Sequence, residues 1–169
     1  MEVVYPMENL NRQLLTNGFK FNDDLKIGTK KTLPEKIVQF GEGNFLRAFV
    51  DYMFDEINEQ GLFEGGITLI QPIPGGDFLR NVLNEQEGLY TLIARGREDG
   101  KEVAAKRLIT CVNRCINPYV DLDTYNTCAK NPELRFVVSN TTEAGISWKE
   151  EDMVTDQPQD SFPAKVCNF

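Results

Sequence analysis

The chain has 169 residues, of which 41% are hydrophobic and 26% charged, and this composition suits one globular domain with a sizeable core. Its net charge of −8 opposes contact with a phosphate backbone, so we expect no nucleic-acid partner. No stretch approaches the ~20 apolar residues of a membrane span, and the first residues lack the apolar run of a signal peptide, so we expect no membrane partner and a cytoplasmic location.

The N-terminal part of the chain predicts a leading helix and an extended arm. Leucines at near-helical spacing place a short helix at residues 7–16, and the polar, lysine-rich residues 19–34 follow as the arm. The apolar patterning of a core begins only after this arm. We therefore divide the chain into a leading helix and arm at residues 1–35 and a domain at residues 36–169.

A βαβ unit is predicted next. Residues 36–40 form one apolar strand, residues 66–71 form a second, and the helix between them stops near Gly61. The helix carries apolar residues four apart on one stripe: Phe45, Phe49, Met53 and Ile57. A βαβ unit has a right-handed crossover and predicts a parallel sheet.

A hairpin interrupts the alternation of strands and helices. Asp77 is placed to cap a helix that follows a loop rich in proline and glycine. Residues 89–97 and 101–109 then have the pattern of strands, and Asp99-Gly100 between them tolerates the positive φ of a tight hairpin turn. Because a hairpin is foreign to the simplest doubly wound sheet, we expect it to be an insertion or an antiparallel edge.

The last third of the chain predicts one more parallel strand. A short helix is expected at residues 118–130 and the strand at residues 134–139, before an acidic and irregular stretch at residues 143–159. Ser161 as a cap and Pro163 in the first turn then open a final helix. Together these elements predict an α/β fold of the Rossmann type, with a mostly parallel sheet and an antiparallel hairpin insertion.

Two glycines join the first core strand to its helix, in an arrangement that suits phosphate groups. Gly41 permits the tight turn, and Gly43 lets the backbone approach a pyrophosphate. Asn44 and Phe45 open the helix, where their amide groups can meet the phosphates; the simpler interpretation makes Asn44 an N-cap and Phe45 a core residue. Leu46 replaces the third glycine of the dinucleotide fingerprint, so this motif alone does not identify the ligand.

A second polar segment follows another predicted parallel strand. Ser139, Asn140 and Thr141 lie at the carboxyl end of that strand, which is where ligands bind in open α/β sheets. We take them as the second cofactor-binding segment. In the alternative interpretation, their side chains only satisfy the backbone of their own turn.

The order and spacing of three segments resemble the mannitol dehydrogenase family of long-chain polyol and uronate oxidoreductases: residues 41–49, 86–92 and 135–146. The resemblance covers roughly residues 36–165. It implies an NAD cofactor and hydride transfer between the nicotinamide and a carbon of a small-molecule sugar acid. It also implies that a following substrate domain supplies the catalytic lysine, asparagine and histidine. This chain would then hold no catalytic residue and be inactive as a fragment, with Glu143 at the rim of the substrate entrance.

The ribose-binding acid of the dinucleotide fingerprint is missing. That acid normally ends the second strand, and here the strand ends in Gln71. Asp77 is the nearest acid beyond it, and we keep both residues as candidate cofactor ligands, although Asp77 has helix capping as a competing role. The preference for NAD over NADP rests mainly on the resemblance, with support from the absence of an arginine directly after the strand.

Histidine is absent from the chain. The chain therefore lacks the commonest general acid and base and the usual partner of a nucleophilic serine or cysteine, which argues against a self-contained hydrolase. The cysteines lack the paired C-x2-C spacing of a structural zinc site. We expect no metal, and buried free thiols at Cys111, Cys115, Cys128 and Cys167.

Two other functions remain open from the residues alone. One is a nucleotide- or S-adenosylmethionine-binding module without a redox role, although the missing acid counts against it because the ribose of that ligand makes the same demand. The other is a structural or interaction domain that keeps the fold without a ligand. The sequence does not determine the oligomeric state.

Overall fold

The computed structural model describes residues 9–152 and 158–169 of the chain. A four-stranded parallel sheet in the order β6-β3-β2-β7 forms the centre of the molecule. Its strands are β2 (Glu35–Phe40), β3 (Gly66–Ile70), β6 (Val112–Ile116) and β7 (Phe136–Ser139). Counted along the chain, they stand in the order 3-2-1-4 of the doubly wound folds, so the prediction of a Rossmann-type, mostly parallel sheet is confirmed.

Helices cover both faces of this sheet. They are α1 (Asn44–Glu59), α2 (Asp77–Glu85), α3 (Leu122–Ala129) and α4 (Phe162–Asn168). Successive residues of a strand point to opposite faces, and β2 shows the consequence. Ile37 packs in a core cluster with residues of α1 and α2, whereas Val38 and Phe40 pack with residues of α3 and α4. The core is therefore double, with the parallel sheet between its two halves.

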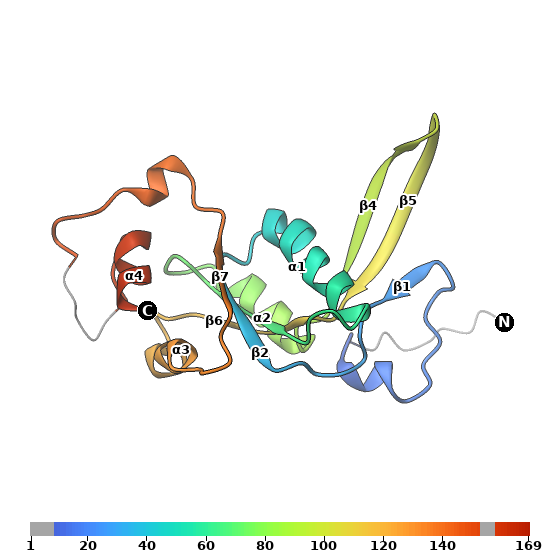
Figure 1. Cartoon of the computed structure of the whole chain (residues 1–169), viewed down its shortest axis with the longest axis horizontal. Coiled ribbons are helices and arrows are strands. Elements are labelled where there is room, and N and C mark those ends of the chain that lie inside the picture. Colours follow the sequence, from blue (N-terminus) through green and yellow to red (C-terminus); the bar gives the residue numbers. More distant parts are fainter. Residues whose placement is uncertain (1–8, 153–157) are drawn as a thin grey trace.

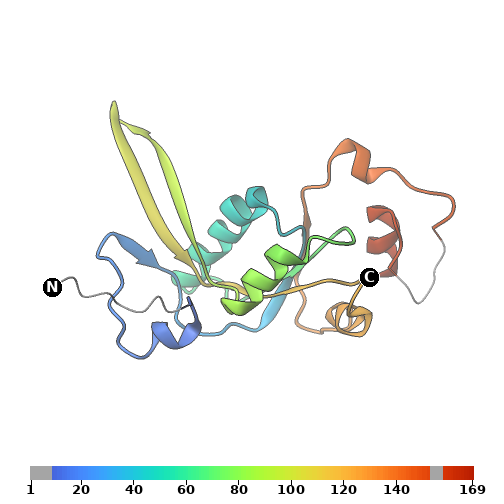
Figure 2. The ribbon, with the colours of Figure 1, turned by 180° about the vertical axis from the view of Figure 1, so that it is seen from behind.

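The predicted hairpin is present and projects from the body of the molecule (Figure 1). It consists of β4 (Tyr90–Glu98) and β5 (Lys101–Ile109). Asp99 and Gly100 at its tip have φ angles of 50° and 78°, which confirms the positive-φ turn. A third strand, β1 (Leu25–Ile27), pairs in parallel with β5. Figure 2 shows this second sheet at one end of the molecule and α3 with α4 at the other.

Several elements differ from the sequence expectation. In the described part of the predicted leading helix, the chain forms only a 3-10 turn at Arg12–Leu15, and residues 7–8 lie outside the described residues. β1 lies in the expected arm, and β6 was not predicted. Both depend on pairing with distant strands, and polar residues interrupt the apolar pattern of β6, where Arg114 forms an ion pair with Glu35 at 2.7 Å.

The acidic stretch and the final helix follow the expectation more closely. One 3-10 turn, Glu143–Ile146, interrupts the irregular stretch, of which residues 153–157 lie outside the described residues. α4 begins as predicted: the Ser161 side chain accepts a hydrogen bond from the Ala164 backbone N–H at 3.4 Å, and Pro163 stands in the first turn.

Within residues 9–152 and 158–169, no helix is long and apolar enough to cross a membrane. No group of histidine, cysteine, aspartate or glutamate side chains in the same part of the chain is arranged to hold a metal ion. The thiols of Cys111, Cys115 and Cys128 are free and buried, whereas that of Cys167 is free and exposed, unlike the expectation.

Candidate functional site

The turn between β2 and α1 leaves the helix start without a side-chain cap. Gly41 has a φ of 120°, and a Cβ placed on it would lie 3.3 Å from Leu46 Cδ1. Gly43 is the N-cap of α1, with an ordinary φ of −70°. A Cβ on Gly43 would meet no described atom within 4 Å. The turn conformation therefore requires glycine at Gly41, whereas Gly43 keeps space open in front of the helix N–H groups.

Asn44 and Phe45 are the first two residues of α1. The simpler interpretation of both is wrong, because Gly43 is the cap and the Phe45 side chain is 62% exposed. The first N–H groups of an α-helix have no partner within the helix, and the helix dipole favours an anion beside them. This turn can therefore receive an anionic group of a ligand.

Arg47 holds the glycine turn in place. Its Nε donates to the Glu42 carbonyl oxygen at 2.8 Å, and its Nη2 donates to Asn44 Oδ1 at 2.5 Å. The guanidinium lies 5.2 Å from the centroid of the Tyr90 ring, and the Tyr90 hydroxyl shares its single proton between the Arg47 carbonyl oxygen at 2.8 Å and Asp51 Oδ2 at 2.9 Å. Sequence reasoning missed this role, because an arginine in a first helical turn is usually solvated. The available signal is its i, i+3 spacing from Asn44.

β3 leads into a buried glutamine. Gln71 Nε2 donates to the Ile73 carbonyl oxygen at 3.0 Å and also to that of Gly75. Its Oε1 is buried and has no hydrogen-bond partner among the described residues. The Gln71 amide thus orders the loop after β3 and leaves one acceptor free.

Asp77 does not cap α2, so the competing role considered for it is wrong. Gly76, with a φ of 74°, is the N-cap, and Asp77 is the first helical residue. Asp77 Oδ1 accepts a hydrogen bond from Asn117 Nδ2 at 3.0 Å and lies 3.4 Å from Arg80 Nη2. The carboxylate therefore stands at the favourable end of the helix dipole, directly after the loop that Gln71 orders.

The second predicted cofactor-binding segment, Ser139 to Thr141, lies against the glycine turn. The register pairs Phe40 with Ser139, and a Cβ on Gly41 would lie 3.5 Å from Asn140 Oδ1. Ser139 Oγ is hydrogen-bonded to the Thr141 hydroxyl and accepts from the Thr141 backbone N–H at 3.1 Å. Ser139 and Thr141 thus satisfy their own turn, as in the alternative interpretation, whereas the Asn140 side chain lies next to Gly41.

A cavity of about 360 Å³ opens at the carboxyl ends of β2, β3 and β7. Of the predicted site residues, it brings together Gly41, Asn140 and Thr141. The other predicted residues are not part of its lining: Gly43, Asn44, Phe45, Gln71, Asp77, Ser139 and Glu143. From β2, the chain continues to β3 on one side of the sheet, whereas β7, which comes later in the chain, pairs with β2 on the other side. The cavity therefore stands where the strand order reverses. Ligands of open α/β sheets bind at this point.

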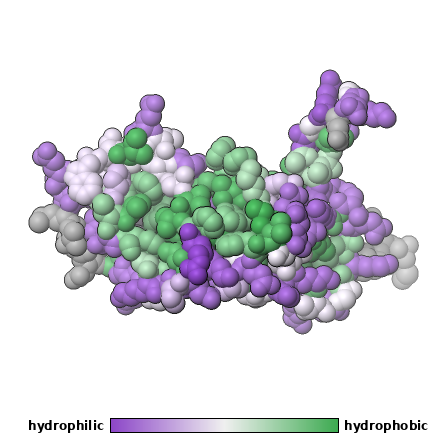
Figure 3. Space-filling model, viewed as in Figure 1, coloured by the Kyte–Doolittle hydropathy of each residue, from purple (hydrophilic) through white to green (hydrophobic). Residues whose placement is uncertain are grey.

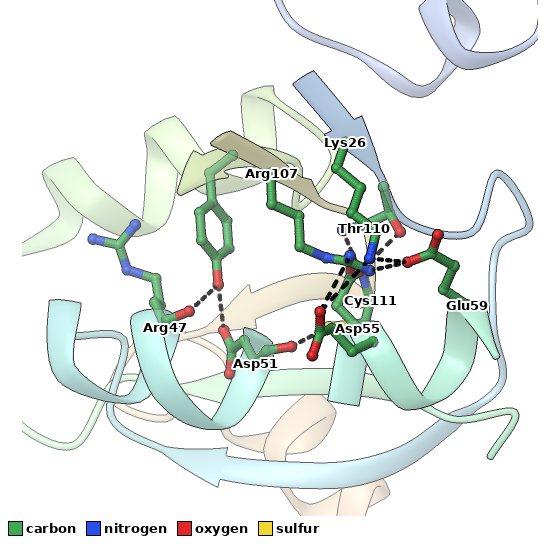
Figure 4. A network of polar contacts seen from close by, with 10 residues as sticks. Lys26, Arg47, Asp51, Asp55, Glu59, Arg107, Thr110 and Cys111 are labelled. Carbon is green, nitrogen blue, oxygen red and sulfur yellow. Dashed lines mark hydrogen bonds and ion pairs between the residues drawn. The ribbon is translucent and has the colours of Figure 1, made fainter. Parts of the chain in front are cut away.

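The buried face of α1, behind the glycine turn, is polar. Asp51, Asp55 and Asn58 are buried and lie at i, i+4 and i+7 along the helix. Asp55 Oδ1 accepts from the Thr110 backbone N–H at 2.8 Å, and Asp55 Oδ2 accepts from Arg107 Nε at 2.6 Å (Figure 4). These contacts fasten α1 to the base of the hairpin.

Asp51 connects α1 to the first residue of the hairpin. Its Oδ2 accepts from the Tyr90 hydroxyl at 2.9 Å, and its Oδ1 has no partner among the described residues. Burial raises the pKa of Asp51 to about 7, and the hydrogen bond from Tyr90 and the polar Gln39 side chain oppose that rise. Gln39 Nε2 also donates to the Gly41 carbonyl oxygen at 3.1 Å. One side chain therefore separates Asp51 from the glycine turn.

The apolar stripe of α1 faces outward. Phe45, Phe49 and Met53 are 62%, 50% and 44% exposed. On the adjacent edge strand β7, Phe136 and Val137 are also about half-exposed. Figure 3 shows the resulting apolar area in the middle of the molecule, over α1 and β7. Folding therefore buries the polar face of this helix and exposes much of the apolar one.

The sequence matches the family described as the mannitol dehydrogenase Rossmann domain over residues 35–165. It is 52% identical over 137 residues to the altronate oxidoreductase of Yersinia enterocolitica, and 45% identical over 136 residues to that of Bacillus subtilis. Each alignment covers 80% of this chain and 28% of the relative. The chain thus spans less than a third of the length of these curated relatives.

Two solved structures share the fold. Pseudomonas fluorescens mannitol 2-dehydrogenase, in a ternary complex with NAD and D-mannitol, gives a TM-score of 0.69 at 24% identity, over 80% of this chain and 27% of that one. A D-sorbitol dehydrogenase in substrate-free form gives a TM-score of 0.70 at 20% identity, over 84% of this chain and 29% of that one.

Proposed function

The chain belongs to the mannitol dehydrogenase family, and from this premise we propose that residues 36–169 bind NAD(H) for a sugar-acid oxidoreductase. The proposed reaction is the reduction of tagaturonate to altronate with oxidation of NADH. The two altronate oxidoreductases at 52% and 45% identity support this substrate class. Residues 1–35 are proposed to be an arm outside the binding domain, and we propose that the protein works in the cytoplasm.

One observation carries the cofactor proposal: the open space in front of the start of α1. Gly43 has a backbone conformation that any residue can adopt, yet its missing Cβ leaves the uncapped helix start accessible. This combination serves a ligand better than it serves the fold, because a serine or aspartate cap would stabilise the helix more. The glycine turn, moreover, stands at the reversal of strand order.

The other candidate residues fit the remaining parts of a dinucleotide. We assign the pyrophosphate to the amides of Asn44 and Phe45, which the helix dipole supports. Gln71 Oε1, which has no partner among the described residues, and the Asp77 carboxylate are acceptors for ribose hydroxyl groups. NAD(H) itself supplies the hydride chemistry.

The nicotinamide side of the site falls to the segment after β7. We assign Ser139, Asn140 and Thr141 to this side, because Asn140 and Thr141 line the cavity together with Gly41. Glu143, one turn further along, is assigned to the rim where the sugar acid enters. The rest of the substrate pocket and the proton transfer are assigned to the part of the relatives that this chain does not cover.

The test is a fluorescence titration of the chain with NADH, compared with its Gly43→Val variant. We expect the variant to bind NADH at least about tenfold more weakly, because a branched side chain fills the space that the pyrophosphate needs. Gly96→Val is the matched control, since a Cβ on Gly96, in the projecting hairpin, also meets no described atom within 4 Å. Circular dichroism checks that both variants remain folded.

Equal NADH affinity of the folded Gly43→Val variant and the Gly96→Val control would remove the glycine turn from the site. Parallel titrations with S-adenosylmethionine and ATP address the alternative functions. Tighter binding of either one than of NADH would replace the redox proposal by a non-redox nucleotide-binding function.

A further inference from the structure

Lys165 is buried in the wall of the cavity at the sheet edge. It lies on α4 and is only 2% exposed. Its Nζ donates to the Asp160 carbonyl oxygen at 2.6 Å and lies 5.4 Å from the centroid of the Tyr119 ring. A backbone oxygen and an aromatic face thus hold the ammonium group at a fixed place.

The charge of Lys165 has no carboxylate partner in residues 9–152 and 158–169, where the ion pairs within 4.0 Å involve other cations. The Asp160 carboxylate, 75% exposed, instead lies 3.4 Å from the Lys149 ammonium group. Burial lowers the pKa of Lys165, and the nearby Asp160 and Asp152 only oppose that effect. A buried charge is normally paired, because its removal from water is costly. The cavity therefore presents a cation that has no counter-ion among the described residues.

The rest of the cavity lining is suited to an anion. Gly41, Asn140 and Thr141 contribute neutral polar groups, and Lys149 adds a second cation. Asp160 is the single acid among the described residues of the lining, and its carboxylate forms an ion pair with Lys149. This local excess of positive charge stands out in a chain with a net charge of −8. A volume of about 360 Å³ is within the range of small-ligand sites.

We propose that this cavity contains an anion subsite, in which the Lys165 ammonium group contacts a phosphate or carboxylate oxygen of a small ligand. The subsite rests on the proposed function, because that function supplies two such anions. One is the diphosphate of NAD(H), and the other is the carboxylate of the sugar acid. In either case the anion provides the counter-charge that the described part of the chain does not.

The test follows the backbone amide NMR signals of Asn140 and Thr141 while sodium diphosphate or sodium altronate is added. Lys165→Met removes the charge and keeps a long apolar side chain, whereas Lys165→Arg keeps the charge. Lys101→Met, at the exposed hairpin tip, is the matched control. We expect one anion to cause a saturable shift of these signals in the native chain and in the control. The affinity for that anion should be at least about tenfold weaker in Lys165→Met and partly recovered in Lys165→Arg. Diphosphate as that anion identifies the cofactor as the source, and altronate identifies the substrate.

Equal anion affinity of the native chain and Lys165→Met would overturn the subsite, as would the absence of a saturable shift with either anion. Thermal unfolding tests a purely structural role: the subsite predicts an unchanged or higher Tm for Lys165→Met, and a lower Tm with unchanged anion affinity refutes it. NADH titration keeps the two proposals apart. If the native chain binds NADH but Lys165→Met has no effect on the affinity for either anion, the subsite alone is rejected. If the native chain does not bind NADH, the proposed function is rejected.

Discussion

The two faces of the parallel sheet differ in the contacts that their helices make. On the α1 face, an apolar cluster around Ile37 is joined by polar, buried contacts between α1 and the hairpin. Asp55 pairs with Arg107 at 2.6 Å, and both side chains are at most 4% exposed. Asp51 accepts from Tyr90 at 2.9 Å. Each of these contacts joins the helix to one strand of the hairpin.

The opposite face is held by aromatic rings. The Phe40 ring packs edge-on against those of Phe162 and Phe169, with centroids 5.4 Å and 5.7 Å apart. The ion pair near this face, between Arg114 and Glu35, involves side chains that are 41% and 26% exposed. Burial of apolar surface therefore holds α3 and α4 in place.

The difference matches the roles proposed for the helices. Hydrogen bonds and ion pairs fix distance and direction, whereas ring packing mainly contributes burial energy and tolerates small shifts. α1 begins at the glycine turn, and the proposed function requires its first N–H groups at a fixed place. α3 covers the sheet, and α4 also carries Lys165 in the cavity wall. Three substitutions test this contrast.

Asp55→Ala should have the largest effect on stability. It leaves the buried Arg107 guanidinium without its 2.6 Å partner and the Thr110 N–H without its acceptor. We expect the free energy of unfolding to fall by about 3–5 kcal/mol, measured by urea denaturation. Asp23→Ala, at an exposed acid, should change it by less than about 0.5 kcal/mol. A similar effect of the two variants would contradict the polar anchoring of α1.

Asp51→Asn should change how stability depends on pH. Between pH 4 and 7 the unfolded chain loses the Asp51 proton while the folded chain keeps it, because burial raises the pKa from 3.8 to about 7. The free energy of unfolding of the native chain therefore falls as the pH rises through this window. Asp51 contributes up to about 4 kcal/mol to the fall and causes no further loss above pH 7. The variant should lack this contribution. The free energy of unfolding of the variant, minus that of the native chain, should therefore be larger at pH 8 than at pH 5. A difference independent of pH in urea denaturation would show that Asp51 titrates normally.

Phe40→Leu should have the smallest effect of the three. It removes ring contacts on the α3 and α4 face but keeps an apolar side chain, so we expect a loss of about 1–2 kcal/mol with no dependence on pH. Phe19→Leu, at a half-exposed ring, is the control and should cost less than about 0.5 kcal/mol. If the Phe40→Leu loss varies between pH 5 and 8, the two faces are not independent.

Local patterns were sufficient for the features that depend on neighbouring residues. The change from strand to helix at Gly41, and the hairpin turn at Asp99 and Gly100, are both set by backbone conformations that few residues tolerate. The parallel order of the sheet followed from the βαβ rule. The assignment of Gly41, Gly43 and the other candidate residues to a cofactor remains a prediction.

Features that depend on distant residues could not be predicted in this way. Asp51 and Asp55 can be buried because Tyr90 and Arg107, on the hairpin, donate hydrogen bonds to their carboxyl groups. The helix pattern alone favours burial of the apolar stripe instead. The same holds for Lys165, whose sequence context is that of a surface lysine and whose burial results from its contacts with Tyr119 and the Asp160 backbone.

The pairing of β2 with β7 has a consequence for how the molecule folds. Phe40 pairs with Ser139, whereas the hairpin pairs Glu98 with Lys101. Closing a long loop costs more entropy than closing a short one, so we expect the hairpin to form early and β7 to join the sheet late. In stopped-flow refolding, NADH fluorescence should rise with the slowest phase, and an earlier rise would contradict this order. A nucleotide that binds only after β7 has joined the sheet would then stabilise the last strand to form, and by mass action it would shift the whole chain toward its native state.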